Sequence, residues 1–410
     1  MNYKNKVKTI CDEITSRIEN IHISCFKDID KPLFLISEQY PGVWMEHVYD
    51  SVLLAQMDKK YLPIAENAIN LFIDHQKASG QLPFAVMDGN KFPGKHAGEM
   101  IRFGHIQECV SFLTLALEVY ELNKNKAFLR KIYNAGKKWN EWFRKCRMTS
   151  GRGLIEMFVG YDTGHDNSGR LHDMRYKGNY VLNNTIQNAD ILPADDEIVP
   201  ILAVDMNCNF YADEKALSKI ASILGEKKEA CHFEKSSEEI KKNLLHYCYD
   251  EEDAFFYDVD KNGNKRKFKS STILHLFLEK VLNFDTDREI IERIYNEHLK
   301  NPDEFWTGYP FPSMAINDPS VEGHPDYNCW GYYTQGLIVL RCIRWMDDYG
   351  WKSDLDYILE KWIETWTNHY DVIKLAQEID PVTGTPTKSS EWYSSCMIAY
   401  LYGSKRLNYI

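Results

Sequence analysis

The sequence predicts an all-α fold, most simply an (α/α)6 barrel of six helical hairpins, and three observations support this expectation. Apolar residues recur with helical spacing along most of the chain, and no extended alternation of apolar and polar residues indicates a large sheet. Segments that are apolar on all sides tend to alternate with amphipathic ones, as the inner and outer helices of a barrel do. Long loops rich in Gly, Pro, Asn, Asp and aromatic residues separate the helices. Periodicity alone would also fit an α-solenoid of similar size.

The helical segments follow one another along the whole chain. Segment 64–73 carries apolar residues on one side, whereas segment 108–121 is apolar nearly all round and is expected to be buried on both sides. A capping box that starts at Ser236 predicts a helix over 237–248. A short strand of a hairpin is expected at 255–260. Further helices are expected at 5–20, 47–59, 127–146, 196–210, 213–224, 270–283, 286–299, 331–348, 353–369 and 392–403.

Four long loops interrupt the helices, at 79–104, 150–194, 300–330 and 371–390. Loops of this length inside a compact domain are usually functional, and we expect them to gather at one end of the barrel. No low-complexity linker divides the chain into halves. Residues 1–40 are therefore expected to form an N-terminal helix and lead-in, packed on a barrel domain of residues 41–410.

The composition limits the possible partners. The 410 residues include 49 Lys and Arg against 60 Asp and Glu, a formal net charge of −11, which argues against binding a nucleic-acid backbone. No apolar run is long enough to span a membrane, and the N-terminus lacks a secretory signal, so a cytoplasmic protein is expected. The ten cysteines show no paired spacing and are expected to be reduced thiols. The oligomeric state stays open.

Two loop segments carry the acidic residues best suited to catalysis. The segment GYDTGHDNSGR, 160–170, holds two Asp, an Asn and an Arg on a Gly-rich turn, for which a tight solvated turn is the alternative. Two carboxylates that converge at one barrel mouth would be the pair needed to hydrolyse a glycosidic bond. The second segment, 376–395, offers Glu378, Asp380 and Glu391. The alternative interpretation of this segment is an ordinary helix end followed by a turn.

Aromatic residues make up 13% of the chain, and many of them lie in the loops. The connection 305–336 combines Trp, Tyr and Phe with several prolines, which a core helix does not tolerate, so we expect it to face a ligand. Nucleotide-binding, serine hydrolase and zinc motifs are absent. A calcium-like series starts at Asp258, but Lys269 stands where a Glu is required, and the series is interpreted as a hairpin turn. Neither a metal nor a cofactor is expected.

Taken in chain order, these clusters resemble motifs of the inverting α-glycosidases typified by trehalase, mannosyl-oligosaccharide glucosidase and mannosylglycerate hydrolase, a glycoside hydrolase family 63-like group. The stretch from Trp44 to Ser51 is similar to the W-x-W-D-S motif, and 160–170 is similar to S-G-x-D-N-S-P-R, with Gly169 in place of the Pro. The Arg of W-R-G-P is absent, because Gly331 follows Trp330 directly. The motifs V-D-L-N-A, G-F-Y-D, N-D-P…Y-W-R-G-P-V-W and E-x-Y-N-P-x-T-G are matched at 203–207, 256–258, 314–331 and 378–384.

The resemblance implies hydrolysis, with inversion, of an α-linked glucoside or a related small α-glycoside. It makes Asp166 the general acid and Glu378 the general base, with carboxyl oxygens roughly 6.5–9.5 Å apart, as inverting enzymes require. Glu391 is the alternative base. The missing Arg after Trp330 leaves the sugar and its aglycone open. Substrate contacts are expected from Trp44, Tyr49, Asp50, Gln107, His165, Asn167, Arg170, Asp205, Asn207, Trp306, Trp330, Glu391 and Trp392.

Two other functions would fit parts of this pattern. A sugar epimerase or isomerase on the same barrel would use histidines as proton shuttles, and His47, His105 and His165 are available for this. A non-catalytic carbohydrate-binding protein would keep the aromatic residues but would lose the distance between acid and base. In all three cases the expected partner is a small sugar, and neither nucleic acid nor a membrane is expected.

Overall fold

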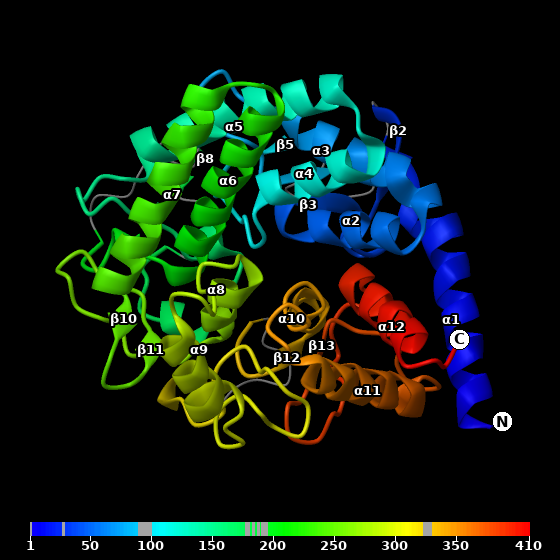
Figure 1. Ribbon diagram of the computed structural model, residues 1–410. Coiled ribbons are helices and arrows are strands. Elements are labelled where there is room, and N and C mark those ends of the chain that lie inside the picture. The colour runs from blue at the N-terminus through cyan, green and yellow to red at the C-terminus, as the bar shows by residue number, and fades with distance from the viewer. Residues whose placement is uncertain are drawn as a thin grey trace.

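Helices account for most of the architecture, as the sequence predicts (Figure 1). The computed structural model describes residues 2–26, 29–88, 101–176, 181–182, 185–186, 189, 196–322 and 330–410. Within these residues the α-helices are α1 (Tyr3–Arg17), α2 (Val48–Met57), α3 (Leu62–Asp74), α4 (Phe112–Asn123), α5 (Lys126–Cys146), α6 (Val204–Ile223), α7 (Lys227–Tyr247), α8 (His275–Leu278), α9 (Arg288–Ile294), α10 (Gly336–Cys342), α11 (Lys352–His369) and α12 (Ser394–Arg406).

The helices pack in two layers (Figure 1). The even-numbered helices contact one another: α2 packs on α4, α4 on α6, α6 on α8 and α10 on α12. The odd-numbered helices cover them from outside, with α7 on α6, α11 on both α10 and α12, and α1 on α12. In addition, α12 packs on α2, so the last inner helix returns to the first.

The sequences of the two layers differ because their burial differs. The outer helix α5 is amphipathic: Ile132, Trp139 and Trp142 are buried on one side, and lysines lie on the other. Asn125 caps its first turn by accepting hydrogen bonds from two backbone N–H groups at 3.0 and 3.1 Å. The inner helix α6, in contrast, is buried along most of its length and includes polar residues that bond within the protein.

Several predicted helix boundaries are wrong. The helices expected at 270–283 and 331–348 are shorter, with α8 limited to His275–Leu278 and α10 to Gly336–Cys342. Segments 196–210 and 213–224 are not two helices, because α6 is continuous and begins only after Pro200, whose ring cannot be accommodated inside a helix. The capping box at Ser236 also fails, since α7 begins at Lys227 and continues through it. The Ser236 hydroxyl instead accepts a hydrogen bond from Arg144, so contact with α5 outweighs the local capping signal.

The strands are short and lie in the connections between helices. The hairpin predicted near 255–260 is present, because Phe255 and Phe256 pair with Tyr249 and Asp250. The calcium-like series turns at Gly263, where φ is +92°, and forms a hairpin turn as predicted. The paired strands are β1 (Ile23–Phe26) with β2 (Ile29–Phe34), β3 (Gly42–Trp44) with β4 (Ala85–Met87) and β5 (Ile101–Arg102), β6 (Glu156–Met157) with β9 (Ile201–Leu202), β7 (Val181–Leu182) with β8 (Thr185–Ile186), β10 (Tyr249–Asp250) with β11 (Phe255–Phe256), and β12 (Thr334–Gln335) with β13 (Glu378–Ile379).

The four predicted long loops are connected by contacts. The N–H of Ala189 donates to the carbonyl of Phe103 at 3.0 Å, which joins the first loop to the second. The N–H of Tyr309 donates to the carbonyl of Pro381 at 2.9 Å, which joins the third loop to the fourth. The hydroxyl of Ser168 lies 3.2 Å from the sulfur of Met314, which joins the second loop to the third. These contacts gather side chains that are far apart in the sequence around one region.

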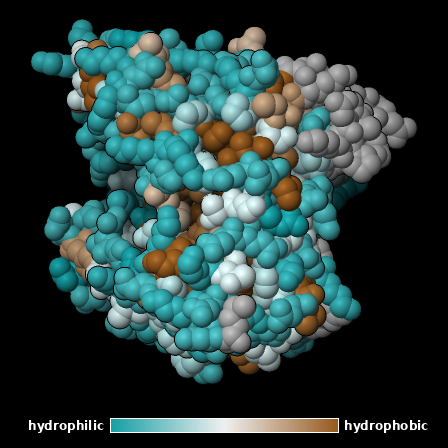
Figure 2. Space-filling view, turned by 90° about the vertical axis from the view of Figure 1, so that its right-hand side faces the viewer, coloured by the Kyte–Doolittle hydropathy of each residue, from teal (hydrophilic) through white to brown (hydrophobic). Residues whose placement is uncertain are grey.

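The surface seen in Figure 2 is covered mostly by polar side chains, and apolar side chains reach it in small groups. Among the described residues, no helix is long and apolar enough to cross a membrane. Apolar side chains instead form one core that extends through both helical layers.

Candidate active site

The loop 160–170 holds two Asp side chains, and their surroundings differ. Asp162 is fully buried, and its carboxylate accepts hydrogen bonds from three backbone N–H groups at 3.0 to 3.2 Å, so it fixes the shape of the loop. Asp166 is partly buried, and its Oδ1 atom is enclosed without a hydrogen-bond partner in the described part of the chain. Of the two carboxyls, Asp166 is therefore the one available for chemistry.

Burial raises the pKa of Asp166 well above its ordinary value, and the negative charge of Glu46 acts in the same direction. The Glu46 carboxylate comes close to this loop at Gly164: a Cβ on that glycine would lie 3.1 Å from Oε2. Gly164 also has a φ of +74°, which favours glycine. A carboxyl that stays protonated near neutral pH can act as a general acid.

Glu46 is held in place by several neighbours. The Nε2 of Gln107 donates to Oε1 at 3.0 Å, and the Nε2 of His47 lies 3.4 Å from the same oxygen. The thiol of Cys109 is 3.7 Å from Oε2. The other end of the Gln107 amide lies 2.8 Å from His105. The predicted residue Gln107 is thus linked to the candidate acid through Glu46.

Glu378 lies on β13 and is fully buried. Gln335, on the paired strand β12, donates a hydrogen bond to Oε2, and the hydroxyl of Thr387 donates to Oε1 at 3.2 Å. Donors on both oxygens suit an ionised carboxylate, which is the form that acts as a base. The alternative base, Glu391, is exposed in the turn before α12.

A buried polar cluster joins α2 to α12. Asp50 accepts hydrogen bonds from the hydroxyls of Ser394 and Ser395, the latter at 2.8 Å, and lies 3.1 Å from the Nδ1 of His47. Burial opposes a charge on His47, but Asp50 and Glu46 outweigh it and raise the pKa of His47 to about 9. Asp50 keeps a buried Oδ1 that no described residue bonds, so this predicted residue has an acceptor left for a ligand.

Arg170 forms buried ion pairs with two carboxylates, Asp205 at 2.6 Å and Asp258. Burial raises the pKa of Asp205 to about 6, although the charge of Arg170 opposes this. The Nδ1 of His165 lies 3.5 Å from Asp205. Burial, together with the charge of Arg170, lowers the pKa of His165 well below its ordinary value, so this ring is neutral. The predicted residues Arg170 and His165 are therefore joined through a third predicted residue, Asp205.

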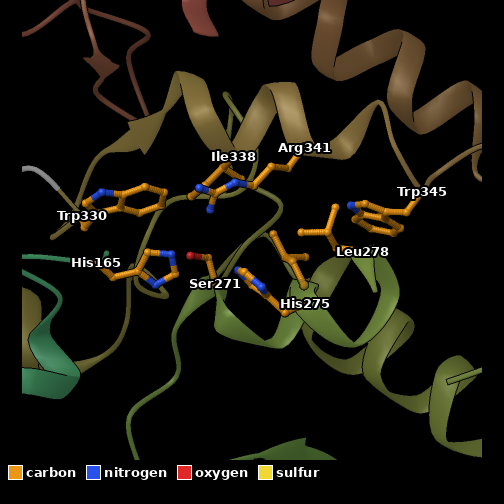
Figure 3. Close-up of a pocket in the computed structure, with 9 residues that line it drawn as sticks. His165, Ser271, His275, Leu278, Trp330, Ile338, Arg341 and Trp345 are labelled. Atoms are coloured by element: carbon orange, nitrogen blue, oxygen red, sulfur yellow. The ribbon is translucent and has the colours of Figure 1, made fainter. Parts of the chain in front are cut away.

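Trp330 and His165 lie at one end of a small cavity, shown in Figure 3. Their ring centroids are 4.1 Å apart, and the guanidinium of Arg341 lies 5.2 Å from the centroid of Trp330. The cavity has a volume of about 10 Å³. Its other lining residues come from segments 271–278 and 338–345 and are Ser271, Leu274, His275, Leu278, Ile338 and Trp345.

Two other predicted residues bond mainly within the protein. The amide of Asn207 makes three hydrogen bonds of 2.8 to 2.9 Å with backbone groups, which uses both its oxygen and its nitrogen. The buried ring of Tyr49 lies 5.4 Å from the guanidinium of Arg344. Asn167, in contrast, is exposed.

The remaining predicted tryptophans contact cations or other rings. The ammonium of Lys300 lies 3.3 Å from the ring centroid of Trp306, and the guanidinium of Arg17 lies 4.1 Å from that of Trp392. Trp44, on β3, packs edge-on against a neighbouring Tyr ring at 6.0 Å. These rings come from three different connections.

Several residues of this region are missed by the sequence analysis as parts of a site, among them Glu46, Gln335 and Arg341. An acidic residue next to His47, in a mostly apolar stretch from Val43 to Val48, is the one signal that could have indicated Glu46. Part of the W-R-G-P match, at 328–329, lies outside the described residues. Within the described ranges, no group of three or more His, Cys, Asp or Glu is arranged to hold a metal ion.

A carboxyl with a raised pKa and a second carboxyl that accepts hydrogen bonds on both oxygens are the kinds of group that acid–base hydrolysis of a glycosidic bond uses. Comparison with family models identifies the particular group. The chain belongs to the family of the mannosylglycerate hydrolase MGH1-like glycoside hydrolase domain, whose model matches residues 46–394. This range takes in both Asp166 and Glu378.

Solved structures of low sequence identity share the fold. The GH63 mannosylglycerate hydrolase of Thermus thermophilus, in complex with glucose, has a TM-score of 0.71 and 15% identity over 96% of this chain and 99% of that one. Its complex with Tris and D-glycerate gives 0.71 and 16% over 97% and 99%. Neutral trehalase Nth1 from Saccharomyces cerevisiae gives 0.68 and 12% over 97% and 80%.

One curated relative also matches, over part of its length. It is an uncharacterized protein of Borreliella burgdorferi that is 30% identical over 149 residues. The match covers 36% of this chain and 30% of that protein.

Proposed function

We propose that this chain is an inverting glycosidase that hydrolyses a small α-linked glycoside, with Asp166 as the general acid and Glu378 as the general base. The observation that carries this proposal is the difference between the two carboxyls. Burial and Glu46 raise the pKa of Asp166, which keeps an oxygen without a hydrogen-bond partner among the described residues. Glu378 accepts hydrogen bonds on both oxygens. One carboxyl is thus suited to donating a proton and the other to accepting one.

The reaction uses the two carboxyls on opposite faces of the sugar ring. Asp166 donates its proton to the glycosidic oxygen while the bond between that oxygen and the anomeric carbon breaks. Glu378 takes a proton from a water molecule, whose oxygen bonds to the anomeric carbon from the other face. The aglycone leaves with the proton of Asp166, the sugar leaves with inverted configuration, and exchange with solvent returns both carboxyls to their starting states.

The family name and the ligands of the Thermus enzyme suggest the substrate class. We propose a hexose in α-linkage to a second small polar molecule, either another sugar or a hydroxy acid such as glycerate. Asp50 supports the binding role expected of it, because its buried Oδ1 can accept a hydrogen bond from a sugar hydroxyl. His165 directly precedes the candidate acid in the chain, and its ring centroid lies 4.1 Å from that of Trp330. Gln107 donates to Glu46, whose charge acts on the acid.

We also propose that the two helical layers form a complete (α/α)6 barrel. The support is the alternation of inner and outer helices and the contact of α12 with α2. Residues 1–40 would contribute α1 and a lead-in that pack on the barrel, and residues 41–410 would form the catalytic domain. A cytoplasmic location fits the small polar substrate.

Anomer-resolved proton NMR of the purified chain, with a panel of α-linked disaccharides and glycosyl glycerates, tests the proposal. The first sugar anomer to appear is expected to be the β form. Release of the α form would refute inversion, a change of sugar without hydrolysis would identify an epimerase, and binding without turnover would identify a binding protein. The variants E378Q and E391Q separate the two candidate bases, because only E378Q is expected to lose nearly all activity.

A further inference from the structure

A second, larger cavity lies among the helices of the inner layer. Its volume is about 300 Å³, within the range of cavities that bind small molecules, and its walls come from α4, α6 and the residues that follow α8 and α10. Leu278 lines both this cavity and the small one shown in Figure 3, so the two share a wall. Neither Asp166 nor Glu378 is among the described residues that line the larger cavity.

Glu279 is a buried carboxyl that faces this cavity. The residue is only 5% exposed, and its Oε1 atom accepts a hydrogen bond from the backbone N–H of Ser111 at 3.0 Å. Among the described residues, none donates to Oε2 and none forms an ion pair with this carboxyl. A buried carboxylate is costly unless hydrogen bonds or a cation satisfy it, so Oε2 is the group of this cavity that calls for a partner.

The basic residues around the cavity already have partners of their own. Each of the three that line it forms an ion pair with another carboxylate, at an N–O distance of 2.6 Å. The pairs are Arg344 with Glu118, Lys215 with Glu234 and Lys280 with Asp348. The charge left over in the cavity is therefore negative and is carried by Glu279.

The rest of the wall includes apolar groups. Leu117, Leu278 and the ring of Tyr211 line the cavity, together with two alanines of α6. A hydrocarbon chain placed against these side chains would be removed from water. We propose that the cavity binds a small organic cation, a protonated primary amine with a short hydrocarbon chain, whose ammonium donates to Oε2 of Glu279. An ammonium supplies both the N–H donor and the positive charge that this oxygen lacks, whereas an alcohol supplies only the donor.

Binding of the amine should depend on pH through Glu279. Burial raises the pKa of Glu279 to about 7, and the charges of Asp213 and Glu118 act in the same direction, although the charge of Arg344 opposes them. The ammonium needs the ionised carboxylate and therefore competes with its proton. With a pKa of about 7, the ionised fraction rises about tenfold between pH 6 and pH 8, so the Kd should fall by about the same factor.

Isothermal titration calorimetry with butylammonium chloride, at pH 6 and at pH 8 and constant ionic strength, tests this proposal. Saturable binding of one amine per chain is expected, with the lower Kd at pH 8. The controls are 1-butanol and sodium butyrate, which have the same chain length without the positive charge. The absence of binding, equal binding of 1-butanol or butyrate, or a Kd that does not change with pH would overturn the proposal. No substrate is used, so the result does not depend on the proposed hydrolysis.

Two variants distinguish this cavity from the candidate active site, where carboxyls could also attract an amine. E279Q keeps an acceptor for Ser111 but removes the charge, and it is expected to lose amine binding. E378Q is expected to keep it, and the reverse result would contradict the proposal. Crystals of the unaltered protein soaked in butylammonium chloride give a test that does not depend on either variant folding. Density for the amine beside Oε2 of Glu279 is expected, and its absence there would overturn the proposal.

Discussion

Replacement of Arg170 by Met is expected to destabilise the protein strongly. Arg170 is the shared partner of Asp205 and Asp258, and all three side chains are at most 6% exposed. Removing one partner of a buried ion pair costs about 3–5 kcal/mol, because the carboxylates that stay behind are left without compensation. With an unfolding entropy of about 2.1 cal/mol/K per residue, this cost lowers the Tm of the 410-residue chain by about 3–6 °C.

The stability lost in R170M should depend on pH, since the pKa of Asp205 is expected to differ between R170M and the unaltered protein. In the unaltered chain burial raises this pKa to about 6 while Arg170 holds it down, so R170M should raise it further. A carboxyl whose folded pKa exceeds its unfolded value loses its stabilising contribution as pH rises toward the folded pKa. Below about pH 6 Asp205 is protonated in both folded proteins and adds no difference. Above about pH 6, R170M continues to lose stability relative to the unaltered protein, because the pKa of its Asp205 is higher.

Denaturation at pH 5 and at pH 8 measures this difference. The matched control is R130M, which removes an Arg paired with Glu226 at a site where the two side chains are 44% and 43% exposed. That control should change the free energy of unfolding by less than about 1 kcal/mol at both pH values. If R170M lost the same free energy at pH 5 and at pH 8, the electrostatic reasoning about Asp205 would be wrong.

Three further predictions concern the carboxyls of the candidate site. D166N should lower kcat/KM by about 10²–10⁴-fold while the Tm is kept or raised, because a general acid and a poorly solvated carboxyl are removed together; steady-state kinetics and calorimetry check this. E46Q removes a charge that raises the pKa of Asp166, so the basic limb of the pH–rate profile should move to lower pH, and an unmoved limb would exclude this role. S395A removes a 2.8 Å donor to buried Asp50 and should cost about 1–3 kcal/mol in urea unfolding, whereas S16A, at a surface position, should cost little.

The helices could be predicted from the sequence because the spacing of apolar residues along the chain is a local property. The amphipathic pattern around Trp139 and Trp142 is repeated over several turns and predicts α5 well. The turn at Gly263 is local in the same way. The start of α7 could not be predicted, because the partner that holds Ser236 inside the helix, Arg144, comes from another helix.

The residues of the candidate site also differ in whether the sequence or only the packing indicates them. Asp166 and Glu378 were indicated by motif order, which is a property of the sequence alone. The charge of Glu46 beside Asp166, and the lack of a described partner for the Nε and Nη2 atoms of Arg341, are properties of packing. No spacing in the chain distinguishes Arg341 from Arg344, although only one of them has a carboxylate beside it.

The contact between α2 and α12 affects how the protein can be made in a cell. Asp50 and Ser394, which bond in the folded protein, are 344 positions apart in the chain. A ribosome that adds about 5–20 residues per second needs roughly 17–70 s to synthesise that interval. During this time the carboxylate of Asp50 lacks the hydroxyl donors that later bury it. The nascent chain therefore passes through a long period in which its earliest inner helix is accessible to chaperones and proteases.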